Sequence, residues 1–241
     1  MTCMAQPELS VVIPVFNEED NLPTLVEEVT AAMGRIGRSY EVLLVDDGST
    51  DGSFARMVEL KAAHPELRCI RFRRNAGQTA AMWAGFRLAR GQVVITLDAD
   101  LQNDPDDIPR LLEKIPEYDA VVGWRAGRKD SLWRLIQSRI ANWIRNKLSG
   151  ETITDTGCSL KAYRRECLQG LKLYRGMHRF LPTLIKMEGY TVAEVPVRHR
   201  PRIHGASKYG MWNRAIPALK DLLAVRWMKQ RLVKYEIEEE R

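Results

Sequence analysis

Two aspartates, Asp98 and Asp100, stand one residue apart directly after the apolar run Gln92–Leu97. Two carboxylates at this spacing can point the same way if the chain turns where the strand ends. Hard cations such as Mg²⁺ bind through a few carboxylate oxygens together with phosphate oxygens of a substrate. A cation held there would neutralise a diphosphate leaving group. Taken alone, the pattern is equally typical of a surface turn that caps a helix. The other polar clusters of the sequence must therefore distinguish a cation site from such a turn.

A second acidic cluster, Asp46-Asp47-Gly48-Ser49-Thr50-Asp51, follows the apolar run Tyr40–Val45. Carboxylates at such a place can accept hydrogen bonds from ribose hydroxyls or from a base N–H. A helix-capping turn is the alternative, and both can hold, since one member can cap while another binds. A third polar pair, Asn17-Glu18, follows the first apolar run, Leu9–Phe16.

Apolar runs alternate with amphipathic stretches through the first half of the chain. This alternation predicts strands at 9–16, 40–45, 68–72 and 92–97 and helices at 20–33, 52–63 and 77–89. Continuously apolar strands separated by helices indicate a parallel sheet that is covered on both faces. Ligands bind such sheets at the carboxyl ends of the strands. We therefore expect an α/β fold in which the three acidic clusters converge on one edge.

The second half of the chain is less regular. It predicts a helix at 106–115, a strand at 119–122, a basic amphipathic helix at 131–148, a strand at 191–198 and a largely helical segment at 209–233 kinked at Pro217. No linker divides the chain into two large domains. We expect one catalytic domain over residues 1–210, followed by a C-terminal amphipathic helix and an acidic tail over 211–241.

The composition is that of a globular protein with a local basic excess. The 241 residues carry 37 basic and 31 acidic side chains, a net charge of +6. Seven Lys or Arg residues fall within 123–148 beside a single acid, which favours an anionic partner such as a phosphate or a membrane surface. The four cysteines lack metal-binding spacing, which predicts free thiols. Neither a signal peptide nor an apolar run of spanning length is present, so we expect a soluble or surface-bound protein.

Several motifs of other enzyme classes are absent. The sequence contains no G-x-G-x-x-G, no P-loop, no H-E-x-x-H and no G-x-S-x-G. Their absence argues against a dinucleotide-binding protein, a P-loop nucleotidase, a zinc protease and a serine hydrolase. No role is assigned to the four histidines.

The clusters, in this order, resemble the GT-A glycosyltransferases of family 2. The segments that carry the resemblance are Val12–Glu18, Val45–Asp51, Arg74–Gly77 and Leu97–Gln102. Two later segments, Asp155–Arg165 and Arg202–Tyr209, are similar to the dolichol-phosphate mannose synthase branch, which includes bacterial enzymes that load undecaprenyl phosphate. The match covers Leu9 to Trp227, nearly the whole chain.

The resemblance implies a role for each matching position. It implies nucleotide binding by Pro14, Phe16, Glu18, Asp46, Asp47 and Gly77, metal binding by Asp98, Asp100 and Gln102, an acceptor-phosphate contact by Arg125, and a basic loop closing over the diphosphate with Arg202, Ser207 and Lys208. The metal would be Mg²⁺ or Mn²⁺. The sequence departs from the family where Phe16 replaces a frequent Tyr and Trp124 a frequent Ser.

The implied activity is an inverting sugar transfer from a UDP- or GDP-sugar to a polyprenyl phosphate. A lipid phosphate is already anionic, so this reaction needs no dedicated general base. A family 2 enzyme that acts on a hydroxyl acceptor is the alternative, and it would require such a base. A non-catalytic binding protein for anionic lipid or nucleic acid would leave the acidic clusters unexplained, and we expect no nucleic-acid partner.

A lipid acceptor requires access to a membrane. Asp130–Leu148 and Met211–Met228 both combine Trp and basic residues with apolar residues at helical spacing, which suits a bilayer interface. Packing of the first stripe on the sheet is the alternative. We expect a peripheral protein on the cytoplasmic face of the membrane, held by the membrane surface or by a membrane partner protein.

Overall fold

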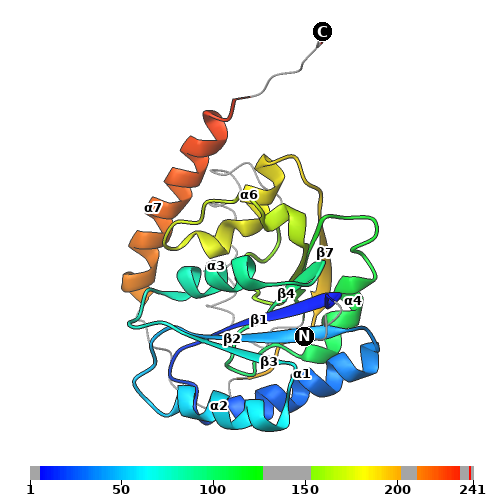
Figure 1. Cartoon of the computed structure of the whole chain (residues 1–241). Coiled ribbons are helices and arrows are strands. Elements are labelled where there is room, and N and C mark those ends of the chain that lie inside the picture. The colour runs from blue at the N-terminus through cyan, green and yellow to red at the C-terminus, as the bar shows by residue number, and fades with distance from the viewer. Residues whose placement is uncertain (1–5, 127–152, 202–210, 234–238, 240–241) are drawn as a thin grey trace.

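The computed structural model describes residues 6–126, 153–201, 211–233 and 239, and gives only the backbone for residues 211–218. Within these ranges the chain forms a seven-stranded sheet with helices on both faces (Figure 1). The basic helix expected at 131–148 and the basic loop with Arg202, Ser207 and Lys208 lie outside the described residues.

The sheet is mostly parallel, as predicted. Its order is β3-β2-β1-β4-β6-β5-β7, and only β6 runs antiparallel to its neighbours. The strands are β1 (Leu9–Val15), β2 (Tyr40–Asp46), β3 (Leu67–Arg71), β4 (Val93–Thr96), β5 (Ala120–Arg125), β6 (Lys161–Arg164) and β7 (Val192–Val197). No local pattern predicted β6, because its four residues include two charged side chains and a tyrosine. The other strands lie within two residues of the predicted starts and within three of the predicted ends.

Helices cover the two faces separately. The helices are α1 (Leu22–Ile36), α2 (Ser53–Ala63), α3 (Gln78–Leu88), α4 (Ile108–Leu112), α6 (Leu181–Met187) and α7 (Met211–Gln230), with short 3₁₀ turns η1 (Pro105–Asp107), η2 (Arg165–Leu168) and η3 (Met177–Phe180). Figure 1 shows α1 and α2 on one side of the sheet and α3, α6 and α7 on the other. The helix predicted at 106–115 is divided between η1 and α4.

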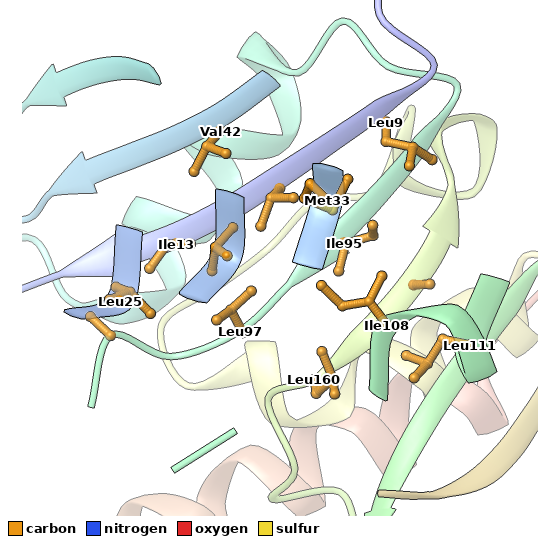
Figure 2. Close-up of a cluster of buried hydrophobic side chains, with 14 of the residues drawn as sticks. Leu9, Ile13, Leu25, Met33, Val42, Ile95, Leu97, Ile108, Leu111 and Leu160 are labelled. Atoms are coloured by element: carbon orange, nitrogen blue, oxygen red, sulfur yellow. The ribbon is translucent and has the colours of Figure 1, made fainter. Parts of the chain in front are cut away.

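The side chains of β1 contribute to two hydrophobic clusters, one on each face of the sheet. Leu9 and Ile13 belong to the cluster under α1 and α4, where Figure 2 shows Ile13 near Leu25 and Leu97, with Leu9 at the other end of the cluster. Val12 faces the opposite cluster, which α3 and α6 cover. Burial on both faces is typical of an interior strand of a covered parallel sheet, and β1 lies inside the sheet between β2 and β4.

The C-terminal helix α7 packs on the second cluster. Its side chains Leu222 and Val225 are buried there, and Met228 packs against them. The helix runs as one element through Pro217. In the described part of the chain, no helix is long and apolar enough to cross a membrane.

Helix α3 lies unusually close to β1. A Cβ atom at Gly85 would overlap the Cγ1 atom of Val12 and lie 3.3 Å from its Cγ2 atom. A Cβ atom at Gly34 in α1 would instead lie in open space, with no neighbouring atom within 4 Å. Gly85 therefore permits the close approach of α3 to the middle of β1.

Replacing these two glycines by alanine should have opposite effects on stability. Gly34→Ala should raise the free energy of unfolding by up to about 1 kcal/mol, because alanine favours the helix. Gly85→Ala should lower it by about 1–3 kcal/mol, because the added methyl overpacks the contact with β1. Urea titrations of both variants measure the difference, and equal shifts would contradict the close packing of α3 on β1.

Candidate active site

One cavity of about 330 Å³ opens at the carboxyl ends of β1, β2 and β4. Nine of the predicted site residues line it: Pro14, Phe16, Glu18, Asp47, Gly77, Asp98, Asp100, Gln102 and Arg125. Asp46 does not line it. The acidic clusters that follow three separate strands thus meet at one edge of the sheet, where the sequence pattern places them.

The loops after β1 and β2 are tied to each other. Asn17 adopts a left-handed backbone with a φ of 55°, which asparagine tolerates better than most residues. Its backbone N–H donates to Ser49 Oγ at 3.0 Å, and its side-chain oxygen accepts from the Thr50 N–H at 2.8 Å. The Glu18 N–H donates to Ser53 Oγ at 2.9 Å. These contacts fix Glu18 at the mouth of the cavity.

The adjacent acids Asp46 and Asp47 have different surroundings. Asp46 is fully buried, accepts from the Ser49 N–H at 2.9 Å and lies 3.4 Å from Arg71 Nε. Asp47 reaches the cavity, where its carboxylate accepts from the Ala76 and Gly77 N–H groups at 2.7 and 2.9 Å. Burial raises the pKa of Asp47, against the lowering effect of those N–H groups. Asp47 therefore ties the end of β2 to the start of α3.

The turn after β4 presents Asp98, Asp100 and Gln102 to the same cavity. Leu101 between them has a φ of 60°, a strained conformation for a side chain without a local polar partner, and it is buried in the core. The Gln102 N–H donates to Asp100 Oδ1 at 3.2 Å. The left-handed turn at Leu101 thus sends its own side chain into the core, while the residues on both sides of it line the cavity.

Arg125, at the end of β5, lies on the cavity wall in a two-point ion pair. Its Nε and Nη2 atoms donate to the Asp155 carboxylate at 2.6 and 2.9 Å. Burial raises the pKa of Asp155, but the hydrogen bonds and charge of Arg125 outweigh it and hold that pKa below its usual range. The bidentate pair orients the guanidinium group.

A buried lysine, Lys161 of β6, stands opposite Thr96, two residues before Asp98. Burial lowers its pKa, and the negative charges of Asp98 and Asp155 act in the opposite sense. We assigned Lys161 no role from the sequence, because nothing in a short polar stretch indicates that its lysine is buried.

Nine further residues line the cavity, and none of them was assigned a role from the sequence. They are Val15, Asn75, Gln78, Ala99, Asn103, Gly157, Cys158, Ser159 and His199. His199 forms an isolated β-bridge with Asn103, and the Arg200 N–H donates to the Gln102 carbonyl at 2.9 Å. These backbone contacts bring a segment distant in sequence to the aspartate turn, and no local pattern in the sequence signals them.

The start of α3 is anchored by a half-buried histidine. His178 Nδ1 lies 2.7 Å from Thr79 Oγ1, which also accepts from the Gly176 N–H at 3.0 Å. Burial lowers the pKa of His178 to about 3, and the charge of Arg179 adds to this. The ring is therefore neutral at physiological pH and acts as a fixed hydrogen-bonding partner.

The oxygen atoms of Asp98, Asp100 and Gln102 suit a hard divalent cation such as Mg²⁺ or Mn²⁺. Among the residues that the structure describes, no three His, Cys, Asp or Glu side chains gather closely enough to hold a metal ion. Two carboxylates and an amide fit a cation whose remaining ligands are water and substrate phosphates, which is the usual coordination of Mg²⁺.

Solved glycosyltransferase structures share this fold. The glucosyl-3-phosphoglycerate synthase from Mycobacterium tuberculosis, in complex with Mn²⁺ and uridine-diphosphate-glucose, superposes with a TM-score of 0.68 over 91% of this chain and 80% of its own, at 19% identity. A mannosyltransferase from Pyrobaculum calidifontis, in complex with GDP-Man and Mn²⁺, gives 0.62 over 95% and 71%, at 22% identity. The predicted GT-A fold is confirmed.

Curated relatives are more similar in sequence. The dodecaprenyl-phosphate galacturonate synthase of Rhizobium johnstonii is 43% identical over 90% of this chain and 66% of its own length. The undecaprenyl-phosphate 4-deoxy-4-formamido-L-arabinose transferase of Aeromonas hydrophila is 43% identical over 84% and 63%. The chain thus spans about two thirds of the length of these relatives.

The family profile described as Glycosyl transferase family 2 matches residues 10–171. That range holds the ends of β1, β2, β4 and β5, from which most of the cavity is built. With this match, the shared fold and the 43% identity, the chain belongs to glycosyl transferase family 2.

Proposed function

We propose that this chain transfers a sugar from a UDP- or GDP-sugar to a polyprenyl phosphate, with inversion at the anomeric carbon. The observation that carries the proposal is a single cavity that joins the carboxylates after β1, β2 and β4 to the oriented Arg125. The relatives named for dodecaprenyl-phosphate and undecaprenyl-phosphate support this acceptor class.

The donor would lie along the carboxyl edge of the sheet. Glu18 and Asp47 offer oxygen acceptors to ribose hydroxyls or base N–H groups. Asp46 would not contact the donor. It would instead stabilise the turn at Ser49 by accepting a hydrogen bond from the Ser49 N–H. Asp98, Asp100 and Gln102 would hold the Mg²⁺ or Mn²⁺ ion, which when bound neutralises charge on the leaving diphosphate. The complexes of structural neighbours with Mn²⁺ and nucleotide sugars support a metal-dependent nucleotide-sugar donor.

The acceptor phosphate would meet Arg125, because a guanidinium group suits two-point binding of phosphate oxygens. An oxygen of that phosphate forms the new bond to the anomeric carbon as the bond to the diphosphate oxygen breaks, and the nucleoside diphosphate leaves. No proton has to be removed from the acceptor, so no base is required. The cavity thiol is no nucleophile either, because burial raises the pKa of Cys158 to about 11. Arg202, Ser207 and Lys208 are proposed to close over the diphosphate.

One face of α7 supports contact with an anionic membrane surface. Leu219, Leu223 and Trp227 are between 49% and 62% exposed, and their spacing of four residues aligns them on the helix. Lys220 is exposed on α7 and Arg231 is exposed directly after it, and the segment 219–233 contains one acid, Asp221. Apolar side chains with flanking basic groups suit the interface of a bilayer with anionic lipids. We place the protein at the cytoplasmic face of the membrane.

The direct test of the proposed reaction is transfer of radiolabelled sugar from a panel of UDP- and GDP-sugars to undecaprenyl phosphate with Mn²⁺. We expect a label in lipid that depends on the metal and is released by mild acid. Asp100→Asn should lower the rate by more than about 100-fold, since even partners of metal ligands typically contribute 10–100-fold. Asp106→Asn changes an exposed acid that follows the Asp98–Gln102 turn, and it should leave the rate unchanged. A label only in a hydroxylated acceptor would contradict the proposal and favour the alternative family 2 activity.

Membrane contact can be tested by sedimentation with vesicles that contain phosphatidylglycerol. The triple variant Leu219→Ser, Leu223→Ser and Trp227→Ser should bind at least about 10-fold more weakly, because burying even one such side chain contributes more than the 1.4 kcal/mol that a factor of ten requires. Val58→Ser provides the control, since Val58 is equally exposed on α2, which Figure 1 shows on the other side of the sheet. Equal loss in both variants, or no loss in either, would refute a role for this face of α7.

A further inference from the structure

Gln78, the first residue of α3, touches the aspartate turn directly. Its Nε2 atom donates to Asp98 Oδ1 at 2.8 Å, and both residues line the cavity. We propose that Gln78 is a positioning residue that orients the Asp98 carboxylate toward the divalent cation. This inference rests on the proposed function, because it concerns the same cation.

The residues before Gln78 are fixed by the sheet. The Asp47 carboxylate accepts from the backbone N–H groups of Ala76 and Gly77 and from Asn75 Nδ2 at 2.9 Å. Gly77 has a φ of 93°, a backbone conformation that residues other than glycine rarely adopt. The chain therefore enters α3 in one direction, which the end of β2 determines.

The residue after Gln78 is fixed from the other side. Thr79 is buried, and its hydroxyl bonds both His178 and the Gly176 N–H. Since His178 is neutral over the physiological range, this anchor does not change with pH there. Gln78 is thus held between two independent anchors, and its side chain has a defined origin from which to reach Asp98.

A neutral amide is well suited to this task. It directs one carboxylate oxygen without cancelling the negative charge that attracts a cation, whereas Lys or Arg at this position would form an ion pair with Asp98. Hydrogen-bond partners of metal-binding carboxylates typically contribute 10–100-fold to metal affinity or activity. The amide does not titrate, so the orientation it imposes is constant over the working pH.

Gln78→Met tests the proposal, because it keeps the length of the side chain and removes the donor. Mn²⁺ binding in the presence of UDP or GDP is measured from the electron paramagnetic resonance signal of free Mn²⁺. We expect the dissociation constant for Mn²⁺ to rise by at least about 10-fold. In the transfer assay the apparent KM for Mn²⁺ should rise likewise, while kcat at saturating Mn²⁺ should change little.

Two further variants separate positioning from a general loss of structure. Gln92→Met changes the same residue type just before β4, at the end of that strand remote from Asp98, and should bind Mn²⁺ as the wild type does. Gln78→Asn keeps the amide on a shorter side chain and should restore part of the affinity. Unchanged Mn²⁺ binding by Gln78→Met, or the same weakening in Gln92→Met, would overturn the proposal. Absence of Mn²⁺ binding by the wild type with either nucleotide would instead refute the metal-dependent function.

Discussion

The parallel pairing of β1 with β2 and β4 determines where the cavity carboxylates lie. The backbone register joins Val15 to Asp46 on one side and Val12 to Thr96 on the other. The residues that follow these strands therefore leave the sheet at one edge. A slip of one residue would exchange the two faces of β1. It would remove Val12 from its close contact with Gly85 and Ser10 from its buried hydrogen bonds with Glu41 and the Gly91 N–H, so these contacts fix the register. The apolar core thus fixes the active site through the strand ends.

Charge balance follows from this arrangement. Glu18, Asp47, Asp98 and Asp100 concentrate negative charge at one end of the cavity, where a nucleoside diphosphate would be repelled unless a cation is bound with it. Under the proposed function, the cation and the donor bind together, and each improves the site for the other. Arg125 stands on the cavity wall already oriented by Asp155, which suits an anionic acceptor and needs little rearrangement.

The features that depend on local pattern could be predicted from the sequence. Strands β1, β2 and β4 are largely apolar runs, and polar residues begin where they end, which is why the convergence of Glu18, Asp47 and Asp98 was predictable. Features that depend on long-range contact could not be predicted. Strand β6 contains few apolar residues and is fixed by pairing with β4 and β5, and Gln78 is brought to Asp98 by anchors that include Gly176 and His178, about 100 residues later. The sequence also could not separate Asp47, which lines the cavity, from Asp46, which does not, because the two are adjacent.

The central claim is that the edge formed by β1, β2 and β4 binds a divalent cation together with the diphosphate of the donor. A crystal structure with Mn²⁺ and UDP or GDP, with anomalous data at the manganese edge, tests it most directly. We expect an anomalous peak within about 2.5 Å of carboxylate oxygens of the Asp98–Asp100 pair, with the nucleotide extending toward Glu18 and Asp47. A peak or a nucleotide bound elsewhere, with this cavity unchanged, would show that this edge is not the donor site.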